Sequence, residues 1–555
     1  MRRKAHAEPT GSGDMAELSV AATSRAASTS APLSLVQAPA SMPAHAFPLL
    51  IGLGLATGME FYTFDSINLV LPDLTGTLGV TGDEASWILT VYSSSLFLGV
   101  PISIWLAGHV GYKRFLVATI LLFAAASMGC ALAPDLSTML AWRAVQGFAG
   151  AGLIVWWRAS IYLLMPKPQR SPSLMRVSTM LYLSSAVGLL ASGAITDHAS
   201  WRLIFLPNLA YAAGAIWLIL RYFPSDHVQP STRLMATDWP GIVLTGIALV
   251  SLQVILNRGE IDDWLGSPNI RMLAWTSAGA FILFVAWQNS WHNRTPLLCL
   301  DLLRDRNVVA SALIGVFTGI ILSGSLYMLP EFLRNVATNS LSATQTGQVM
   351  AVYALSAAAV RPLMVPVIAH LGQRKTILLA LLLLVASMVL ISHFLTSGTP
   401  ASYFYLPLVL YALCLSALLP AVGSGTVARI EQHKLLDGVS LYMSFRQFGA
   451  TLGVTLLTNL VERRETLHSS RLFEHLRATS GQVHDWLTHV SSILGARGGH
   501  SLIESERMAA KLLAEVGARQ AATLAYADAF IFMALVGVAT ICLLPIIPPT
   551  PVAKK

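Results

Sequence analysis

Charged residues are scarce in this chain. Asp, Glu, Lys and Arg together make up 12% of its 555 residues, whereas a typical soluble domain contains about 25%. Hydrophobic residues reach 54%, and the mean hydropathy is +0.62. This composition excludes an ordinary soluble protein and predicts an all-α protein that crosses the lipid bilayer many times.

Cysteine is also rare, and several functional motifs are missing. The four cysteines have neither the spacing of a disulfide framework nor that of a metal site; they are Cys130, Cys299, Cys414 and Cys542. The sequence contains no H-E-x-x-H, no G-x-S-x-G and no G-x-x-x-x-G-K-[ST]. We therefore expect no metalloprotease, serine hydrolase or ATP-driven pump, no cofactor and no metal.

The net charge of +8 does not require a nucleic-acid partner, because cytoplasmic loops of membrane proteins are rich in Lys and Arg. Residues 1–46 carry Arg2, Arg3 and Lys4 but no apolar segment behind them. They are not typical of a cleavable signal peptide and predict a disordered cytoplasmic tail.

Apolar runs long enough to span a bilayer recur fourteen times. They are 47–71, 86–107, 115–133, 137–165, 173–195, 201–222, 239–256, 272–290, 307–329, 346–369, 376–396, 403–427, 439–460 and 524–547. An even number places both termini on one side. Most basic residues then fall on the same side as the N-terminus, which predicts cytoplasmic termini in a cell inner membrane.

A short turn occurs twice. Gly108-His109-Val110-Gly111-Tyr112-Lys113-Arg114 follows the second run, and Ala369-His370-Leu371-Gly372-Gln373-Arg374-Lys375 follows the tenth. Internal repeats of this kind are typical of secondary transporters. We therefore expect the following organisation: an N-terminal six-helix bundle (47–222), two inserted helices (223–300), a C-terminal six-helix bundle (301–547) and a cytoplasmic tail (548–555).

The first run contains two acids, Glu60 and Asp65. A charge at such depth is costly, about 2.5–3.5 kcal/mol on insertion scales, so each should face a wet or protein-lined space. Five residues apart on a helix, the two carboxylates should point in different directions and should not line the same cavity wall. Either they only bind polar neighbours, or at least one of them exchanges a proton or binds a cation.

Further motifs resemble those of a known family. Arg143-Ala-Val-Gln146-Gly147 fits an R-x-x-Q-G pattern, and Gly188 with Ser192-Gly193 resembles a fifth-helix glycine motif. Ser444-Phe-Arg446-Gln-Phe-Gly449 is similar to a penultimate-helix pattern. With the repeated turn, these segments resemble the fourteen-helix drug:proton antiporter (DHA2, EmrB/QacA-like) branch of the major facilitator superfamily.

The resemblance implies export of amphipathic drugs in exchange for protons. It makes Gly108, His109, Gly111, Lys113 and Arg114 a conformational-switch loop, although Gly108 replaces the usual acid. It also makes Gly188 and Gly193 the glycines of the fifth-helix motif, where Leu189 replaces the usual proline.

The acid that relatives carry in the first helix falls at Thr63 in this chain. We therefore expect Glu60, one turn away, to carry the proton, with Asp65 as second choice. Arg143 either supports such an acid or only binds helix backbone.

The expected substrate cavity includes polar and aromatic residues from several runs: Tyr62, Asn68, Gln146, Tyr327, Arg361 and Arg446. Arg361 and Arg446 either recognise an anionic substrate or bind backbone carbonyls at helix breaks. Arg158 should extend from the end of its helix toward the headgroups, and Asp528 should lie at the membrane interface.

Segment 461–523 is long and charged, and it lies between two runs on the outside. Leu502, Met508, Leu512 and Leu513 predict an amphipathic helix within it. The resemblance implies that this side contacts a periplasmic membrane fusion protein and an outer-membrane channel. Alternatives are a proton-coupled importer or exporter of a specific metabolite or siderophore, and a sensor or scaffold that transports nothing.

Overall fold

The computed structural model describes residues 45–224, 238–259, 262–293, 296, 298, 300–337, 340–427, 435–475, 481–498 and 501–546. The predicted tails, 1–46 and 548–555, lie outside these ranges except for His45 and Ala46. The described residues form helices, and no strand occurs among them.

The helices of the first part of the chain are α2 (Ala46–Leu78), α3 (Gly82–Val110), α4 (Tyr112–Ala131), α5 (Leu136–Leu164), α6 (Lys167–His198) and α7 (Pro207–Tyr222). A hairpin of α8 (Trp239–Arg258) and α9 (Pro268–Gln288) follows. The remaining helices are α10 (Arg306–Glu331), α11 (Ala343–Val360), α12 (Met364–Leu371), α13 (Gln373–Phe394), α14 (Tyr405–Val427), α15 (Leu435–His475), α16 (Gly481–Gly498) and α17 (Leu502–Cys542).

Twelve helices of the described chain are long and apolar enough to cross a membrane, and they coincide with twelve of the predicted runs. The tenth predicted run is interrupted at Arg361-Pro362, where a 3₁₀ turn separates α11 from α12. The break follows from proline, which has no backbone N–H to continue the helix. The thirteenth predicted run lies in α15.

The repeated turn has the same backbone conformation in both copies. Gly111, between α3 and α4, has φ 94°, and Gly372, between α12 and α13, has φ 75°. Positive φ is accessible to glycine at little cost because it lacks a Cβ. The structure thus confirms the repeated turn that the sequence indicates.

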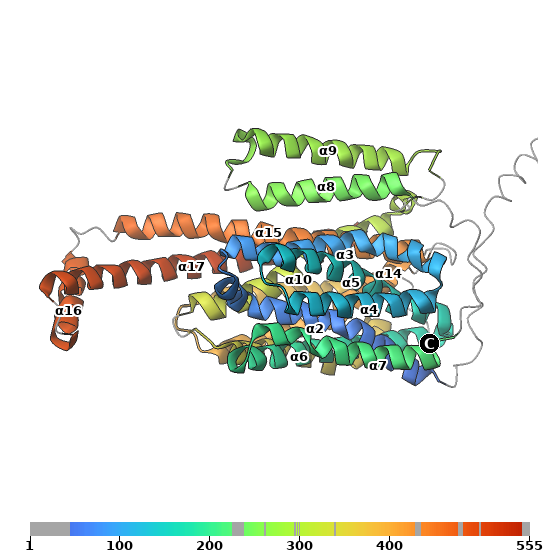
Figure 1. The fold of residues 1–555 in the computed structure, drawn as a ribbon, viewed down its shortest axis with the longest axis horizontal. Helices are drawn as coiled ribbons and strands as arrows, with labels where there is room; N and C mark the ends of the chain where they lie inside the picture. Colours follow the sequence, from blue (N-terminus) through green and yellow to red (C-terminus); the bar gives the residue numbers. More distant parts are fainter. Residues whose placement is uncertain are drawn as a thin grey trace, which may run out of the picture.

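The helices are arranged as two groups that meet along two seams (Figure 1). Helices α2–α7 pack among themselves, as do α10, α11, α13, α14, α15 and α17, and the groups meet where α6 packs on α11 and α3 packs on α15. The first seam is tight: a Cβ on Gly193 of α6 would lie 2.5 Å from the carbonyl oxygen of Ala343. Only glycine allows the two backbones to come this close.

Helices α8 and α9 stand beside the main bundle, next to α3 and α15 (Figure 1). One buried carboxylate ties the hairpin together. Asp238 caps α8 by accepting from the Gly241 N–H, and it also accepts from Trp287 Nε1 and Gln288 Nε2 at the end of α9. The hairpin therefore has its own polar anchor.

Helices α15 and α17, of 41 residues each, extend well beyond the bundle, and α16 packs at the tip of α17 (Figure 1). The predicted amphipathic helix around Leu502 is present, but it is the start of α17 and continues into the last span. The prediction that residues 461–523 form a loop is wrong for the described residues. Helices α15 and α17 continue beyond the apolar runs into this segment. Asp528 accepts from His468 across the two helices (2.8 Å).

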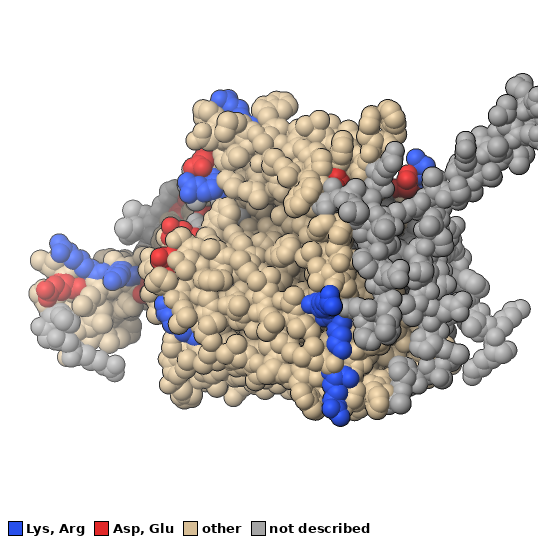
Figure 2. Space-filling view, turned by 45° about the vertical axis from the view of Figure 1, so that its right-hand side comes forward, with Lys and Arg blue, Asp and Glu red and all other residues tan. Residues whose placement is uncertain are grey.

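Figure 2 shows a broad surface without Lys, Arg, Asp or Glu between a row of basic side chains and a group of mixed charges. Such a band is what a bilayer requires of the protein surface. We call the end of the bundle where α2 and α10 end, and from which α15 and α17 project, the far end. The opposite end, where α2 begins, is the near end.

Candidate functional site

A cavity of about 530 Å³ lies between the two groups of helices. Its wall includes residues of α2, α3, α5 and α6 on one side and of α10, α11, α12, α14 and α15 on the other. The lining residues of α6 come from its first part (Arg170–Tyr182), and those of α15 also come from its first part (Val439–Ala450). Because both helices begin at the near end, the cavity extends from the middle of the bundle toward that end.

Both acids of α2 line this one cavity, although the sequence predicted that they would not share a cavity wall. That prediction was wrong because one broad face of α2 borders the cavity, with Phe61 and Phe64 between the two acids. Their hydrogen bonds do differ. Glu60 Oε1 accepts from the Tyr92 hydroxyl of α3 (3.3 Å), within the first group.

Asp65 instead connects the two groups. Its Oδ2 accepts from the hydroxyl of Ser185 on α6 and from that of Tyr353 on α11 (2.8 Å). The two hydroxyls are themselves 3.0 Å apart. Hydrogen bonds to an ionised acceptor are stronger than neutral ones, so the charged form of Asp65 stabilises the contact between α2, α6 and α11.

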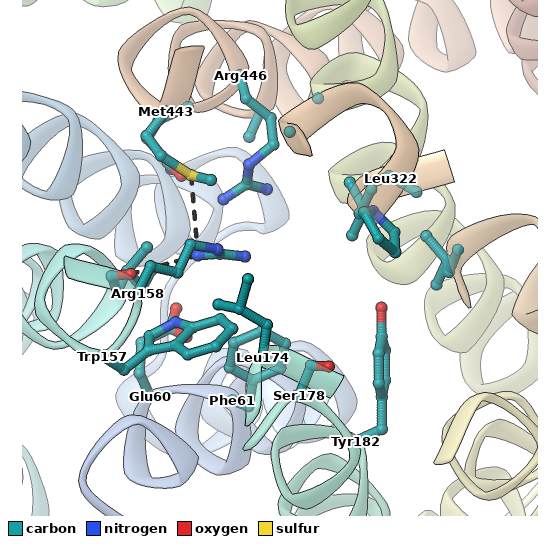
Figure 3. Close-up of a pocket in the computed structure, with 18 of the residues that line it drawn as sticks. Glu60, Phe61, Trp157, Arg158, Leu174, Ser178, Tyr182, Leu322, Met443 and Arg446 are labelled. Atoms are coloured by element: carbon teal, nitrogen blue, oxygen red, sulfur yellow. Dashed lines mark hydrogen bonds between the residues drawn. The ribbon is translucent and has the colours of Figure 1, made fainter. Parts of the chain in front are cut away.

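Four arginines also line the cavity, namely Arg158, Arg170, Arg361 and Arg446. Figure 3 shows Arg158 and Arg446 reaching into the same space from opposite walls, above Trp157 and Glu60. The prediction that Arg158 extends toward the headgroups is therefore wrong. Its position on α5 faces the partner group of helices, which the sequence alone does not reveal.

Arg361 stands at the break between α11 and α12, as Pro362 suggested. Its Nε donates to Ser178 Oγ (2.9 Å) and one terminal nitrogen donates to the Leu415 carbonyl (3.1 Å). The reading in which this arginine binds a backbone carbonyl is thus correct in part, and the Ser178 bond adds a second tie between the groups.

Arg143 is fully buried and does not line the cavity. It donates to the Ile88 carbonyl (3.2 Å) and to Gln146 (2.7 Å), and its guanidinium lies 4.0 Å from the centre of the Tyr92 ring. It forms no ion pair with either α2 acid among the pairs of the described residues. Tyr92 lies against both groups: its ring packs on the Arg143 guanidinium, and its hydroxyl donates to Glu60.

Four predicted cavity residues lie elsewhere, because the rotation of each helix about its axis turns them away. Gln146 donates to Ser127 (2.7 Å) in a network that continues through Asn208 to Thr63. Tyr62 donates to the Ile204 carbonyl (2.9 Å), and Asn68 donates to the Phe64 carbonyl of its own helix. Tyr327 is buried in α10 outside the lining.

Several lining residues carry no motif, including Trp157, Tyr182 and Met443, and the sequence did not predict Tyr182 and Met443. Tyr182 lies four residues after Ser178, one turn along α6. Together with Arg170 nearer the start of the helix, this spacing is the sequence signal for a polar face on α6.

The switch-loop residues lie together at the near end. Lys113 Nζ donates to the Leu220 and Phe223 carbonyls at the end of α7 (2.8 and 3.0 Å), which places a cation at a helix C-terminus. His109 bonds the Trp105 carbonyl (3.1 Å). Gly108 lies in the last turn of α3, Gly111 forms the turn between α3 and α4, and Arg114 is exposed. Gly188 packs on α2, where a Cβ would lie 2.7 Å from the Tyr62 carbonyl oxygen.

At the far end, two polar contacts join the groups. Arg334, which follows α10, forms a two-pronged ion pair with Asp73 of α2. Asp197 of α6 accepts from the backbone N–H groups of Ala343 and Thr344 at the start of α11 (3.1 and 2.8 Å). The cavity is therefore closed off at the far end by contacts between groups.

Comparisons with known proteins agree with this architecture. The family model of the Major Facilitator Superfamily matches residues 53–454. The fatty acid resistance protein FarB of Neisseria gonorrhoeae is 25% identical over 461 residues, 80% of this chain and 86% of FarB. The multidrug export protein EmrB of Haemophilus influenzae is 25% identical, with 77% of this chain and 83% of EmrB covered.

Solved structures show the same fold. An inward-facing, unoccupied bacterial homologue of the human lysosomal transporter Spinster aligns with a TM-score of 0.55 at 17% identity, covering 91% of this chain and 98% of that one. The xylose transporter XylE from E. coli, partially occluded and inward open, gives 0.54 at 11% identity, covering 92% and 100%.

The two helical groups around a central cavity define a multi-pass membrane transporter and not an enzyme. The chain belongs to the Major Facilitator Superfamily. Its similarity to proteins named EmrB and FarB confirms the resemblance to the EmrB-like drug exporters of this superfamily.

Proposed function

We propose that this protein exports amphipathic organic compounds from the cytoplasm in exchange for protons. The observation that carries the proposal is the central cavity, which has aromatic and aliphatic walls and six ionisable side chains contributed by both groups of helices. Apolar walls with a few placed polar groups suit amphipathic ligands. The names of the relatives, which include multidrug export and fatty acid resistance, favour export over import.

In this proposal the near end faces the cytoplasm. Lys113 and Arg114 lie at that end, in agreement with the positive-inside rule. The cavity then extends toward the cytoplasm, and the two far-end contacts separate it from the outside. The conformation is thus the one that takes up substrate from inside the cell.

We assign the coupling proton to Asp65, which was the second choice from sequence, in place of Glu60. Asp65 bonds Ser185 in one group and Tyr353 in the other, so its charge acts directly on a contact that must change during transport. Protonation of Asp65 removes the charge that these two hydrogen bonds stabilise and so loosens the contact between α2, α6 and α11. Uptake of the proton from outside and its release inside is the direction that proton-driven export needs.

Glu60 and Arg143 have other tasks in this scheme. Glu60 supplies one of the two negative charges of the cavity wall. It lies below Arg158 and Arg446 in Figure 3. Arg143 holds α3 and α5 together through the Ile88 carbonyl, and its bond to Gln146 stays within α5.

A periplasmic membrane fusion protein, with an outer-membrane channel, is the partner we propose for the far-end extension of α15, α16 and α17. The start of α17 leaves apolar side chains uncovered among the described residues: Leu502 (77% exposed), Ile503 (65%), Met508, Leu512 and Val516. An apolar stripe on a helix is a common binding surface for a partner helix.

Accumulation assays test the export proposal. Cells that produce the protein should accumulate less of a fluorescent amphipathic dye than cells that lack it. An uncoupler should remove the difference, because it collapses the proton gradient. Equal accumulation in both strains for dyes of every charge would refute export.

Deletion of residues 470–515 tests the partner. The deletion removes the projecting tips and α16 but keeps both spans, so transport in purified proteoliposomes should remain while resistance of intact cells falls. Unchanged resistance in intact cells would rule out the adaptor at this surface.

A further inference from the structure

The charges that line the cavity are unbalanced. Four arginines, Arg158, Arg170, Arg361 and Arg446, face two acids, Glu60 and Asp65. A cationic side chain within the membrane region is costly unless it is paired or bonded. The excess of positive charge therefore points to a negative group that completes the site during the transport cycle.

Two of the four arginines are held by the protein itself. Arg361 donates to Ser178 and to the Leu415 carbonyl. Arg170, at the near-end mouth, donates from Nε to the Met165 carbonyl (3.2 Å). Arg361 is thus fixed in the wall by two hydrogen bonds, and Arg170, with one, lies at the mouth of the cavity.

The other two have donors to spare. Arg158 makes a single long bond to the Ile154 carbonyl of its own helix (3.3 Å) and a 4.0 Å contact with Met443 Sδ. Within the described part of the chain, the Arg446 guanidinium makes no hydrogen bond and no ion pair at contact distance, and its charge acts on Glu60 only through space. Both guanidinium groups point into the same space (Figure 3).

Both carboxylates of the cavity already accept hydrogen bonds from the protein, so they offer few acceptors to a cation. Asp65 is occupied by Ser185 and Tyr353, and Glu60 accepts from Tyr92. Two guanidinium groups facing each other match the planar, two-oxygen geometry of a carboxylate or sulfonate. A cationic head group at the same place would meet two like charges.

The walls around the arginine pair are apolar and aromatic. Phe61 and Trp157 lie below it, Leu174 and Tyr182 line the side toward α6, and Leu322 stands opposite (Figure 3). These side chains suit a hydrophobic body attached to a charged head.

We propose that this cavity selects amphipathic organic anions, with the acidic head held between Arg158 and Arg446 and the apolar body against Phe61, Trp157 and Tyr182. The inference deepens the proposed function, because it names the charge of the exported compound. It also gives Glu60 a defined effect: its negative charge, next to the arginine pair, weakens the hold on the anion and so favours release.

Three probes that differ only in the head group test the proposal: 1-pyrenebutyrate, 1-pyrenebutanol and 1-pyrenebutyltrimethylammonium. Binding to the full-length protein in nanodiscs is measured by fluorescence, with empty nanodiscs subtracted. The anion should bind at least about tenfold more tightly than the cation, as expected for two charge-assisted contacts.

Variants localise the effect. Arg158→Gln and Arg446→Gln should each weaken binding of the anion about tenfold or more and leave binding of the neutral probe nearly unchanged, which also shows that the variants are folded. Glu60→Gln should strengthen binding of the anion. Arg176→Gln is the matched control, because Arg176 lies on α6, is exposed and does not line the cavity.

The result separates this inference from the export proposal. Selective binding of the anion in a protein that exports nothing supports the site and refutes export. Equal or tighter binding of the cation, unchanged binding in both arginine variants, or weaker binding of the anion in Glu60→Gln overturns the inference, whatever the export assay gives.

Discussion

Arg334 and Asp73 join the two groups of helices at the far end by a two-pronged ion pair, in which the second bond measures 2.9 Å. Both side chains are largely shielded from solvent. The pair connects α2 with the turn that follows α10, so it exists only while the far ends of these helices are together. It therefore holds the cavity shut on that side.

Asp73→Ala should increase opening at the far end. Removing the carboxylate leaves Arg334 without its partner and lowers the free energy needed to separate the groups. A cysteine placed at Thr346, which is fully buried near the start of α11, should then be alkylated faster from outside, as read by mass spectrometry.

The double exchange Asp73→Arg with Arg334→Asp should restore slow alkylation. Arg258→Ala is the control, because Arg258 pairs with Asp262 on the exposed surface and joins no two groups. Equal alkylation rates in Asp73→Ala and in the parent would show that the ion pair does not close this end.

The two acids of α2 should respond differently to neutralisation. Asp65→Asn should abolish substrate-driven proton movement in proteoliposomes, since the amide takes up no proton. Glu60→Gln should keep proton movement and alter only the affinity for substrate. The opposite pattern, with proton movement lost in Glu60→Gln and kept in Asp65→Asn, would return the coupling role to Glu60.

Gly193→Val should block transport without preventing insertion. A side chain at this position would meet the Ala343 backbone and push α6 away from α11. Uptake into inverted vesicles should fall at least about tenfold, because the groups no longer meet at the far end. Gly279→Val on α9 is the control, since a Cβ at that position would meet no atom within 4 Å; it should transport normally.

The α8–α9 hairpin should lose stability in acid. Burial raises the pKa of Asp238, but hydrogen bonds from Trp287, Gln288, Gly241 and Asn293 outweigh this effect, and the pKa is lowered from 3.8. Because the folded pKa is lowered, the stabilisation is complete above pH 4 and is lost as the pH falls through the folded value.

Asp238→Ala should therefore destabilise the hairpin by about 1–3 kcal/mol at neutral pH. Hydrogen exchange of α9 measures the change. Asp301→Ala, which removes an exposed carboxylate, should behave like the parent protein. If the two variants have the same exchange rates, Asp238 does not anchor the hairpin.

The sequence was informative where a residue type has one physical explanation. Gly111 and Gly372 predicted a repeated turn because their positions suit glycine, and both have positive φ. The acids of α2 marked the cavity, because a carboxylate inside an apolar run needs a polar environment.

The sequence was misleading where the rotation of a helix about its axis decides which side chains face the cavity. Gln146, Tyr62 and Asn68 occur on the expected helices but face their own group, whereas Arg158, expected at the headgroups, faces the cavity. These orientations depend on how all the helices pack, since neighbouring positions on a buried helix are similarly apolar. No local pattern distinguishes them.

The length of α15 and α17 has a mechanical consequence. A 41-residue helix is about 60 Å long, which exceeds the hydrocarbon thickness of about 30 Å. Each is a single stiff rod with one end among the cavity-lining helices and the other in water. When the second group of helices tilts to expose the cavity to the other side, α15 and α17 tilt with it and their tips move through an arc. Each transport cycle therefore moves any protein that is bound at the tips.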